Sequence, residues 1–126
     1  MSRWKATSSA RRIVFRHRQV TLAWERSGEK LSFAGIYGAG GRRRGFTLGS
    51  SPLWRLELRD RAGYPTRLEG SAGAGFSWRA GGSLVLRWTG MAGGLVDVVV
   101  RVTADDDRPV TRWRLAVVNR SRAHTV

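Results

Sequence analysis

The feature of this 126-residue sequence that most constrains its fold is an alternation of apolar and polar side chains with a period of two. It runs through Val20–Arg26, Leu53–Asp60, Ser83–Thr89, Leu95–Thr103 and Val110–Asn119. Successive side chains of a β-strand point to opposite faces of a sheet, so this period indicates strands with one apolar face. No comparable helical stripe occurs after residue 20. The pattern therefore predicts an all-β chain.

Short turns separate the predicted strands. Ser27–Glu29 joins Val20–Arg26 to Leu31–Tyr37 as a hairpin, and Ala80–Gly82 forms a second compact turn. Parallel strands need long crossover connections, so we expect antiparallel pairing in a β-sandwich of about seven to nine strands. The residues expected in its core are Trp54, Leu56, Leu58, Leu84, Leu86, Val98, Val100, Trp113, Leu115 and Val117.

The first nineteen residues differ from the rest in showing no clear alternation. We expect either a basic N-terminal tail or a short edge strand at Arg12–Arg16 guarded by charge, followed by one sandwich domain over residues 20–126. No secretory signal and no apolar run of about 20 residues is present, so no membrane partner is expected. Either the protein stays inside the cell or the sequence does not begin at its original start, so the location is left open with the cytoplasm as the default.

The formal net charge of +14 suggests a polyanionic partner such as nucleic acid. All of the 23 basic residues except Lys5 and Lys30 are arginine, and they are scattered over the strands, which favours coding bias as the origin of the charge. Local density occurs in the N-terminal segment and in the glycine-rich loop Gly38–Gly45. That loop makes Arg42, Arg43 and Arg44 the candidate contacts for a polyanion.

Residues that carry catalysis are sparse. Cysteine is missing, His17 and His124 are expected to be exposed and inert, and no nucleophile or metal motif is found. The carboxylates considered as a possible pair for glycoside cleavage are Glu25, Glu29, Glu57, Glu69 and Asp97. Surface ion pairs with arginine explain Glu57 and Asp97, and Asp105–Asp107 is expected to be a solvated turn. We therefore predict no catalytic site, cofactor or metal.

Tryptophan is the most informative apolar residue. Four tryptophans fall in phase with aliphatic neighbours and are expected in the core: Trp24, Trp54, Trp88 and Trp113. Trp4 and Trp78 are less constrained. Trp78 beside Arg79 is a candidate for stacking on a sugar ring or a base, although its alternation with Phe76 favours the core.

Two segments resemble a known family. Ser51–Leu58 (SPLWRLEL) and Arg112–Ser121 (RWRLAVVNRS) look like strands from the N-terminal β-sandwich domains of large glycoside hydrolases, which have the galactose-mutarotase-like supersandwich fold. The hairpin of Val20–Trp24 with Leu31–Tyr37 is similar to the first hairpin of these domains.

The resemblance implies a non-catalytic domain that supports a carbohydrate-binding cleft, with catalysis by a downstream barrel domain. It also implies that the chain is the front part of a longer domain, so some apolar surface is expected to be uncovered. No catalytic residue can be carried over. The alternative hypothesis is a basic β-domain that binds nucleic acid or another polyanion through Arg42–Arg44.

Overall fold

The computed structural model describes residues 3–28, 30–38, 45–47, 52–70, 75–122 and 124–126. In these residues the chain forms twelve β-strands and one four-residue helix, which confirms the all-β prediction and exceeds the seven to nine strands expected. The strands are β1 (Lys5–Ser8), β2 (Arg12–Arg16), β3 (Val20–Ser27), β4 (Lys30–Gly38), β5 (Gly45–Thr47), β6 (Arg55–Asp60), β7 (Pro65–Glu69), β8 (Phe76–Ala80), β9 (Leu84–Gly90), β10 (Val96–Ala104), β11 (Thr111–Asn119) and β12 (His124–Thr125), with α1 (Met91–Gly94) between β9 and β10.

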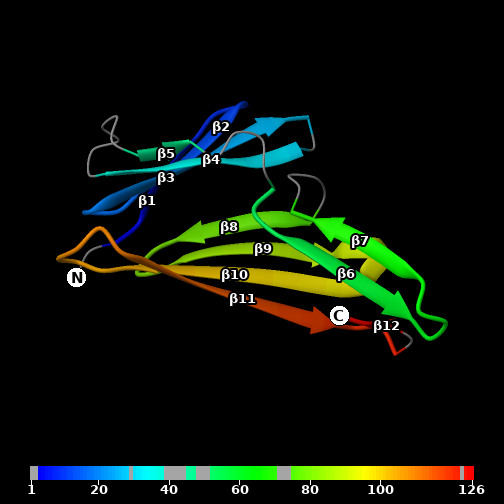
Figure 1. The fold of residues 1–126 in the computed structure, drawn as a ribbon. Coiled ribbons are helices and arrows are strands. Elements are labelled where there is room, and N and C mark those ends of the chain that lie inside the picture. Colours follow the sequence, from blue (N-terminus) through cyan, green and yellow to red (C-terminus); the bar gives the residue numbers. More distant parts are fainter. Residues whose placement is uncertain (1–2, 29, 39–44, 48–51, 71–74, 123) are drawn as a thin grey trace.

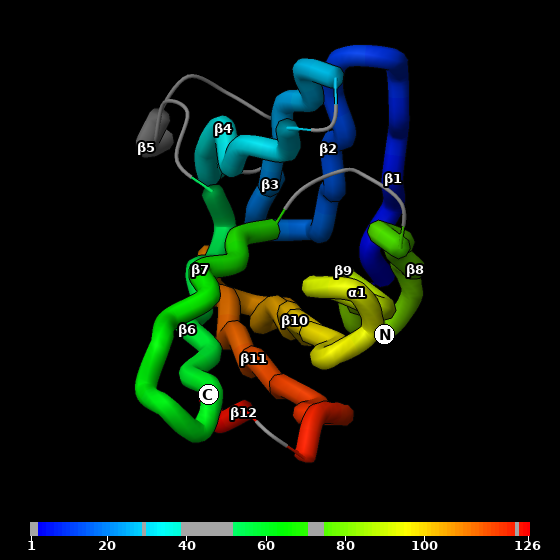
Figure 2. Tube along the Cα trace, turned by 90° about the vertical axis from the view of Figure 1, so that its right-hand side faces the viewer, coloured from blue at the N-terminus to red at the C-terminus, as the bar shows by residue number. Residues whose placement is uncertain are grey.

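The strands form three sheets, in which every pair is antiparallel. Their orders are β1-β2-β3-β4-β5, β11-β10-β9-β8 and β12-β6-β7. Figure 1 shows the five-stranded sheet stacked above the four-stranded sheet, as expected for a sandwich. In Figure 2 the three-stranded sheet lies on the side of β11, away from β8. The predicted antiparallel architecture is therefore confirmed.

The five-stranded sheet is built on the predicted hairpin. β3 pairs antiparallel with β4, as predicted. The register shifts by one residue between Ala23 and Trp24. Phe15 of β2 packs edge-on against Trp24, with ring centroids 5.2 Å apart, and both side chains are buried. These aromatic side chains supply the upper half of the core.

The four-stranded sheet supplies the lower half. Residues in register across antiparallel strands share a face, so Trp78, Leu86, Val100 and Leu115 form one row that crosses β8, β9, β10 and β11. Leu86 and Val100, in the middle of the row, are buried. This row marks the inner face of the sheet, toward β1–β5.

The three-stranded sheet is joined to this core by an aromatic contact. Trp54, just before β6, meets Trp88 of β9 with the ring planes nearly perpendicular and the centroids 5.3 Å apart. Leu58 of β6 is fully buried. The sandwich is therefore closed on the β6 side by a small sheet.

The predicted core is confirmed for most of its members and wrong at β11. Trp113 is 37% exposed and Leu115 is 44% exposed, while Leu56 and Val117 are half-buried. β11 is an edge strand of its sheet, so among the described residues its inner-face side chains have a neighbouring strand on one side only and stay partly exposed. Trp113 still reaches inward, because its ring lies 5.6 Å from that of Phe33. Alternation therefore identified the face of β11 correctly but not its burial.

The N-terminal segment is part of the folded body. Trp4 is buried, and its backbone N–H donates to the carbonyl of Gly81 over 2.7 Å. Arg12–Arg16 does form a strand, but the prediction of an edge strand there was wrong, because β2 lies between β1 and β3 and the edges of the sheet are β1 and β5. The part of the chain that the structure describes contains no helix with the length and apolar character of a membrane span.

Candidate polyanion-binding surface

The outer face of the four-stranded sheet gathers arginines that are far apart in the sequence. Strand register places Arg79, Arg101 and Arg114 in one row, with Val85 between the first two. Arg87 lies in the next row, opposite Ser77 and Val99, and Arg112 lies opposite Thr103. We call this surface the arginine face; its members are Arg79, Arg87, Arg101, Arg112 and Arg114, and all five are exposed.

The arginine face is broad and shallow. Neighbouring strands are about 4.8 Å apart, so the four strands spread these charges over about 15 Å. A hollow of about 410 Å³ lies at the β10–β11 end and is lined by Arg101, Thr103, Arg112, Trp113 and Arg114. Such a surface suits an extended ligand better than a small enclosed one.

The arginines of this face have no acidic partners in the described residues. No carboxylate oxygen there lies within 4.0 Å of their guanidinium groups. Arg101 Nη1 donates a hydrogen bond to Ser83 Oγ at 3.1 Å. Guanidinium groups on neighbouring strands repel one another, and an anionic ligand would relieve this repulsion.

Val85 shows how the arginine side chains lie. It points to the outer face of the sheet, yet it is only 2% exposed. Its neighbours in the row are Arg79 and Arg101. Arginine commonly lays its aliphatic stem over apolar surface while its charged end stays in water. We infer that these stems cover Val85, which holds the guanidinium groups above the sheet.

The one acidic side chain that β8–β11 carry on this face, Asp97, is already paired with an arginine. Asp97 of β10 accepts hydrogen bonds from the backbone N–H of Gly90 at 2.8 Å and from Arg120 Nε at 2.9 Å. The hydrogen bond from Gly90, and then that from Arg120, hold the pKa of Asp97 below its ordinary value. The carboxylate therefore stays ionised and paired, and Arg120 offsets its charge.

Of the residues predicted to contact a ligand, the structure describes Trp78, which does not lie on this face. Arg42, Arg43 and Arg44 lie outside the described residues. Trp78 follows the inner row, opposite Leu86, and its ring meets that of Phe15 edge-on at 5.3 Å while remaining 36% exposed. Trp78 and Arg79 are adjacent in sequence but project from opposite faces of β8.

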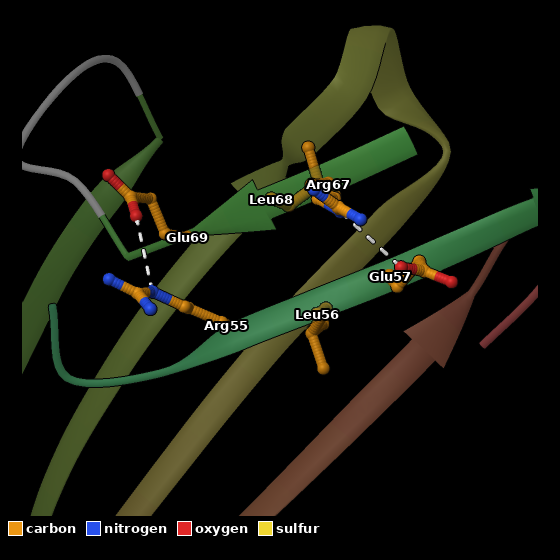
Figure 3. Close-up of a pocket in the computed structure, with 6 residues that line it drawn as sticks. All are labelled: Arg55, Leu56, Glu57, Arg67, Leu68 and Glu69. Carbon is orange, nitrogen blue, oxygen red and sulfur yellow. Dashed lines mark hydrogen bonds and ion pairs between the residues drawn. The ribbon is translucent and has the colours of Figure 1, made fainter. Parts of the chain in front are cut away.

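The carboxylates Glu57 and Glu69 line a hollow of about 660 Å³ over β6 and β7, drawn in Figure 3. Arg67 Nε lies 3.4 Å from Glu57 Oε2 and Arg55 Nε lies 3.7 Å from Glu69 Oε2. Dashed lines mark these two ion pairs in Figure 3. Arg59 also contacts Glu57 at 2.6 Å. These exposed ion pairs confirm the interpretation of Glu57 as a surface partner of arginine. Each of the two carboxylates is therefore paired with arginine.

The histidines do not behave as expected. His17 is buried beside Trp4, with Nε2 3.6 Å from Asp106 Oδ1, and His124 is half-buried with Nδ1 2.7 Å from Ser121 Oγ. The prediction that both are exposed was therefore wrong. The strand pairing of the N-terminal segment, which alternation did not reveal, buries His17 between β2 and the β10–β11 loop.

The acidic turn after β10 is a closed local structure. Asp105 accepts hydrogen bonds from the backbone N–H of Asp107 at 3.0 Å and from Arg108 Nη2 at 3.0 Å, and these contacts lower its pKa. No group of three or more potential metal ligands is found among the described residues. Asp106 and Asp107 are exposed, as expected for a solvated turn, whereas Asp105 is half-buried.

The arginine face was missed in the sequence because its members come from four strands. The available signal was that each arginine falls out of phase with the apolar residues of its strand. Only the strand order and register show that these positions share one surface. The chain matches no protein-family model, no curated protein and no solved structure.

Proposed function

We propose that the chain is a non-catalytic β-sandwich domain that binds a linear polyanion, with the phosphate backbone of nucleic acid as the reference ligand. The binding surface is the arginine face on β8–β11. The observation that carries this proposal is the alignment of five exposed arginines on one side of one sheet without acidic partners in the described residues.

The chemistry of arginine supports this function. Its guanidinium group stays charged and offers several N–H donors in a planar arrangement that suits phosphate and sulfate oxygens. Neutralising the charges of a linear polyanion also releases its condensed counterions, which favours binding at low salt. Contacts from arginines to the phosphate backbone carry no sequence information, so we expect little sequence preference.

The test compares three triple variants that each remove three positive charges. The first carries Arg79→Gln, Arg87→Gln and Arg101→Gln, since glutamine keeps part of the stem over Val85. The second removes Arg42, Arg43 and Arg44, and the third is a control at Arg11, Arg18 and Arg61, which lie in turns of the described structure. Duplex DNA and heparin serve as probes in fluorescence anisotropy at low salt.

The first variant is expected to bind both probes at least about tenfold more weakly, a loss of about 1.4 kcal/mol, while the control changes little. Loss for DNA alone would identify a surface for phosphate backbones, and loss for heparin alone a surface for sulfated polysaccharide. Equal losses in the first and third variants would overturn the proposal, because net charge alone would then explain binding. A loss confined to the second variant would move the site to the loop.

The carbohydrate-active role stays a prediction from the resemblance. Trp78, at 36% exposure, is the surface aromatic that this role would use. A titration of neutral oligosaccharides that quenches tryptophan emission in the native chain, and not in Trp78→Leu, would support it.

A further inference from the structure

We propose that the free edge of β11 accepts an extended peptide strand in which acidic and apolar residues alternate. This inference concerns the strand edge that borders the arginine face and shares Arg112 and Arg114 with it. It names a different class of ligand and does not depend on the proposed function. It rests on three properties of β11, which are a backbone edge that pairs with no further strand among the described residues, exposed apolar side chains, and two arginines without a carboxylate partner in the same part of the chain.

The backbone of β11 is paired on one side only. All nine residues of the strand align with β10, and no other strand among the described residues pairs with it. Five consecutive side chains, Arg112 to Ala116, are exposed, so both faces of the strand are open along this stretch. An unpaired edge of this kind is a template for a further strand.

Apolar side chains line the inner side of this edge. Trp113 and Leu115 project from the inner face and remain exposed, although their register partners Val102 and Val100 are buried. The ring of Trp113 is held against Phe33 and Trp24, at centroid distances of 5.6 and 6.2 Å. An added strand would therefore find a fixed apolar platform for every second side chain.

The arginines of β11 indicate which side chains the ligand carries at its other alternate positions. Arg112 and Arg114 project from the outer side of the same edge and have no carboxylate partner in the part of the chain that the structure describes. A strand whose opposite positions carry glutamate or aspartate would pair with them across the edge. A second copy of this chain fits less well, since it brings the same arginines and a further net charge of +14.

The probe is a seven-residue peptide, capped at both ends, in which three glutamates alternate with four valines. Two control peptides keep its composition. In the first the three glutamates are consecutive, and in the second the alternating order is kept while two central residues are N-methylated, which blocks both hydrogen-bonding edges. Binding to the full chain is measured by amide chemical shifts and by tryptophan emission.

The alternating peptide is expected to bind at least about tenfold more tightly than either control, and to perturb the amides of β11. The double variant Arg112→Glu and Arg114→Glu should lose this binding and instead bind the peptide that has lysine in place of glutamate. The Arg79, Arg87 and Arg101 triple variant should retain peptide binding, so this inference and the proposed function can fail separately.

Equal binding of the three glutamate peptides would overturn the inference, because attraction by charge alone would then explain it. The N-methylated peptide tests the strand geometry without any change to the protein. A concentration-dependent dimer in sedimentation, dissociated by Leu115→Lys, would also overturn it and would assign the edge to a second copy.

Discussion

β10 and β11 are neighbouring strands with the same alternation, yet one is the centre of the core and the other is its margin. Val98 and Val100 are buried, whereas Leu115, the register partner of Val100, is 44% exposed. Both strands project apolar side chains from the same face of the sheet. Alternation therefore assigns a side chain to one face of the sheet, whereas burial depends on the layer that covers that face.

The largest expected difference between the centre and the margin of the core comes from shortening a leucine at two places in one row. Leu86 of β9 and Leu115 of β11 both lie in register with Val100, and Leu86 is buried. Leu86→Ala should lower the free energy of unfolding by about 2 to 5 kcal/mol, because it leaves a cavity. Leu115→Ala should cost less than about 1 kcal/mol, since water already reaches the site. Urea denaturation measures both, and similar costs would contradict the assignment of β11 to the margin.

The second test concerns the polar contact that holds the end of β11. Arg120, just after β11, binds Asp97 of β10, and Gly90 donates to the same carboxylate. Removing the charge by Asp97→Asn weakens both contacts and should cost about 2 kcal/mol at neutral pH. Asp107→Asn, an exposed change in the β10–β11 loop, is the matched control and should cost almost nothing.

The pH dependence of this contact has a definite sign. The pKa of Asp97 is lower in the folded chain than in the unfolded chain, so its stabilisation is fully present above the unfolded value, about 3.9. It is lost as the pH falls through the lower, folded value. The stability difference between the native chain and Asp97→Asn should therefore shrink in acid. A difference that persists unchanged at the acid end would mean that the charge is not involved.

The smallest expected effect comes from adding volume at the margin. Ala116 of β11 is exposed, so Ala116→Val gains β-propensity without a clash and should stabilise the chain by about 0.5 kcal/mol or less. The same change at Ala23, which is fully buried in β3, should destabilise by about 1 to 3 kcal/mol through overpacking. A thermal melt of the two variants would give opposite shifts, and a destabilised Ala116→Val would show that β11 is covered after all.

Much of the fold follows from local patterns in the sequence. The hairpin of β3 and β4, the strand β10 and the turn at Asp105 were all predicted, because each depends on alternation or turn residues within a short segment. Two features depend on distant contacts and were missed. Trp4 is buried in the core beside His17, and Leu115 is exposed because its sheet ends at β11.

The candidate site was less predictable than the fold. Arg79, Arg87 and Arg101 are scattered in the sequence, and scattering was interpreted as coding bias. The strand order and register place them on one face, and neither can be inferred from a single segment of the sequence. The converse holds for Trp78 and Arg79, which are adjacent in the sequence and lie on opposite faces of β8.

The central claim, that the arginine face is where a polyanion binds, is tested most directly by the salt dependence of DNA binding. Each arginine that neutralises a phosphate contributes about 0.9 to the slope of log K against log salt concentration. The account predicts that the variant of Arg79, Arg87 and Arg101 reduces this slope by about 2 to 3, and that the variant of Arg11, Arg18 and Arg61 leaves it unchanged. Equal slopes in the native chain and the first variant would show that these arginines do not touch the polymer.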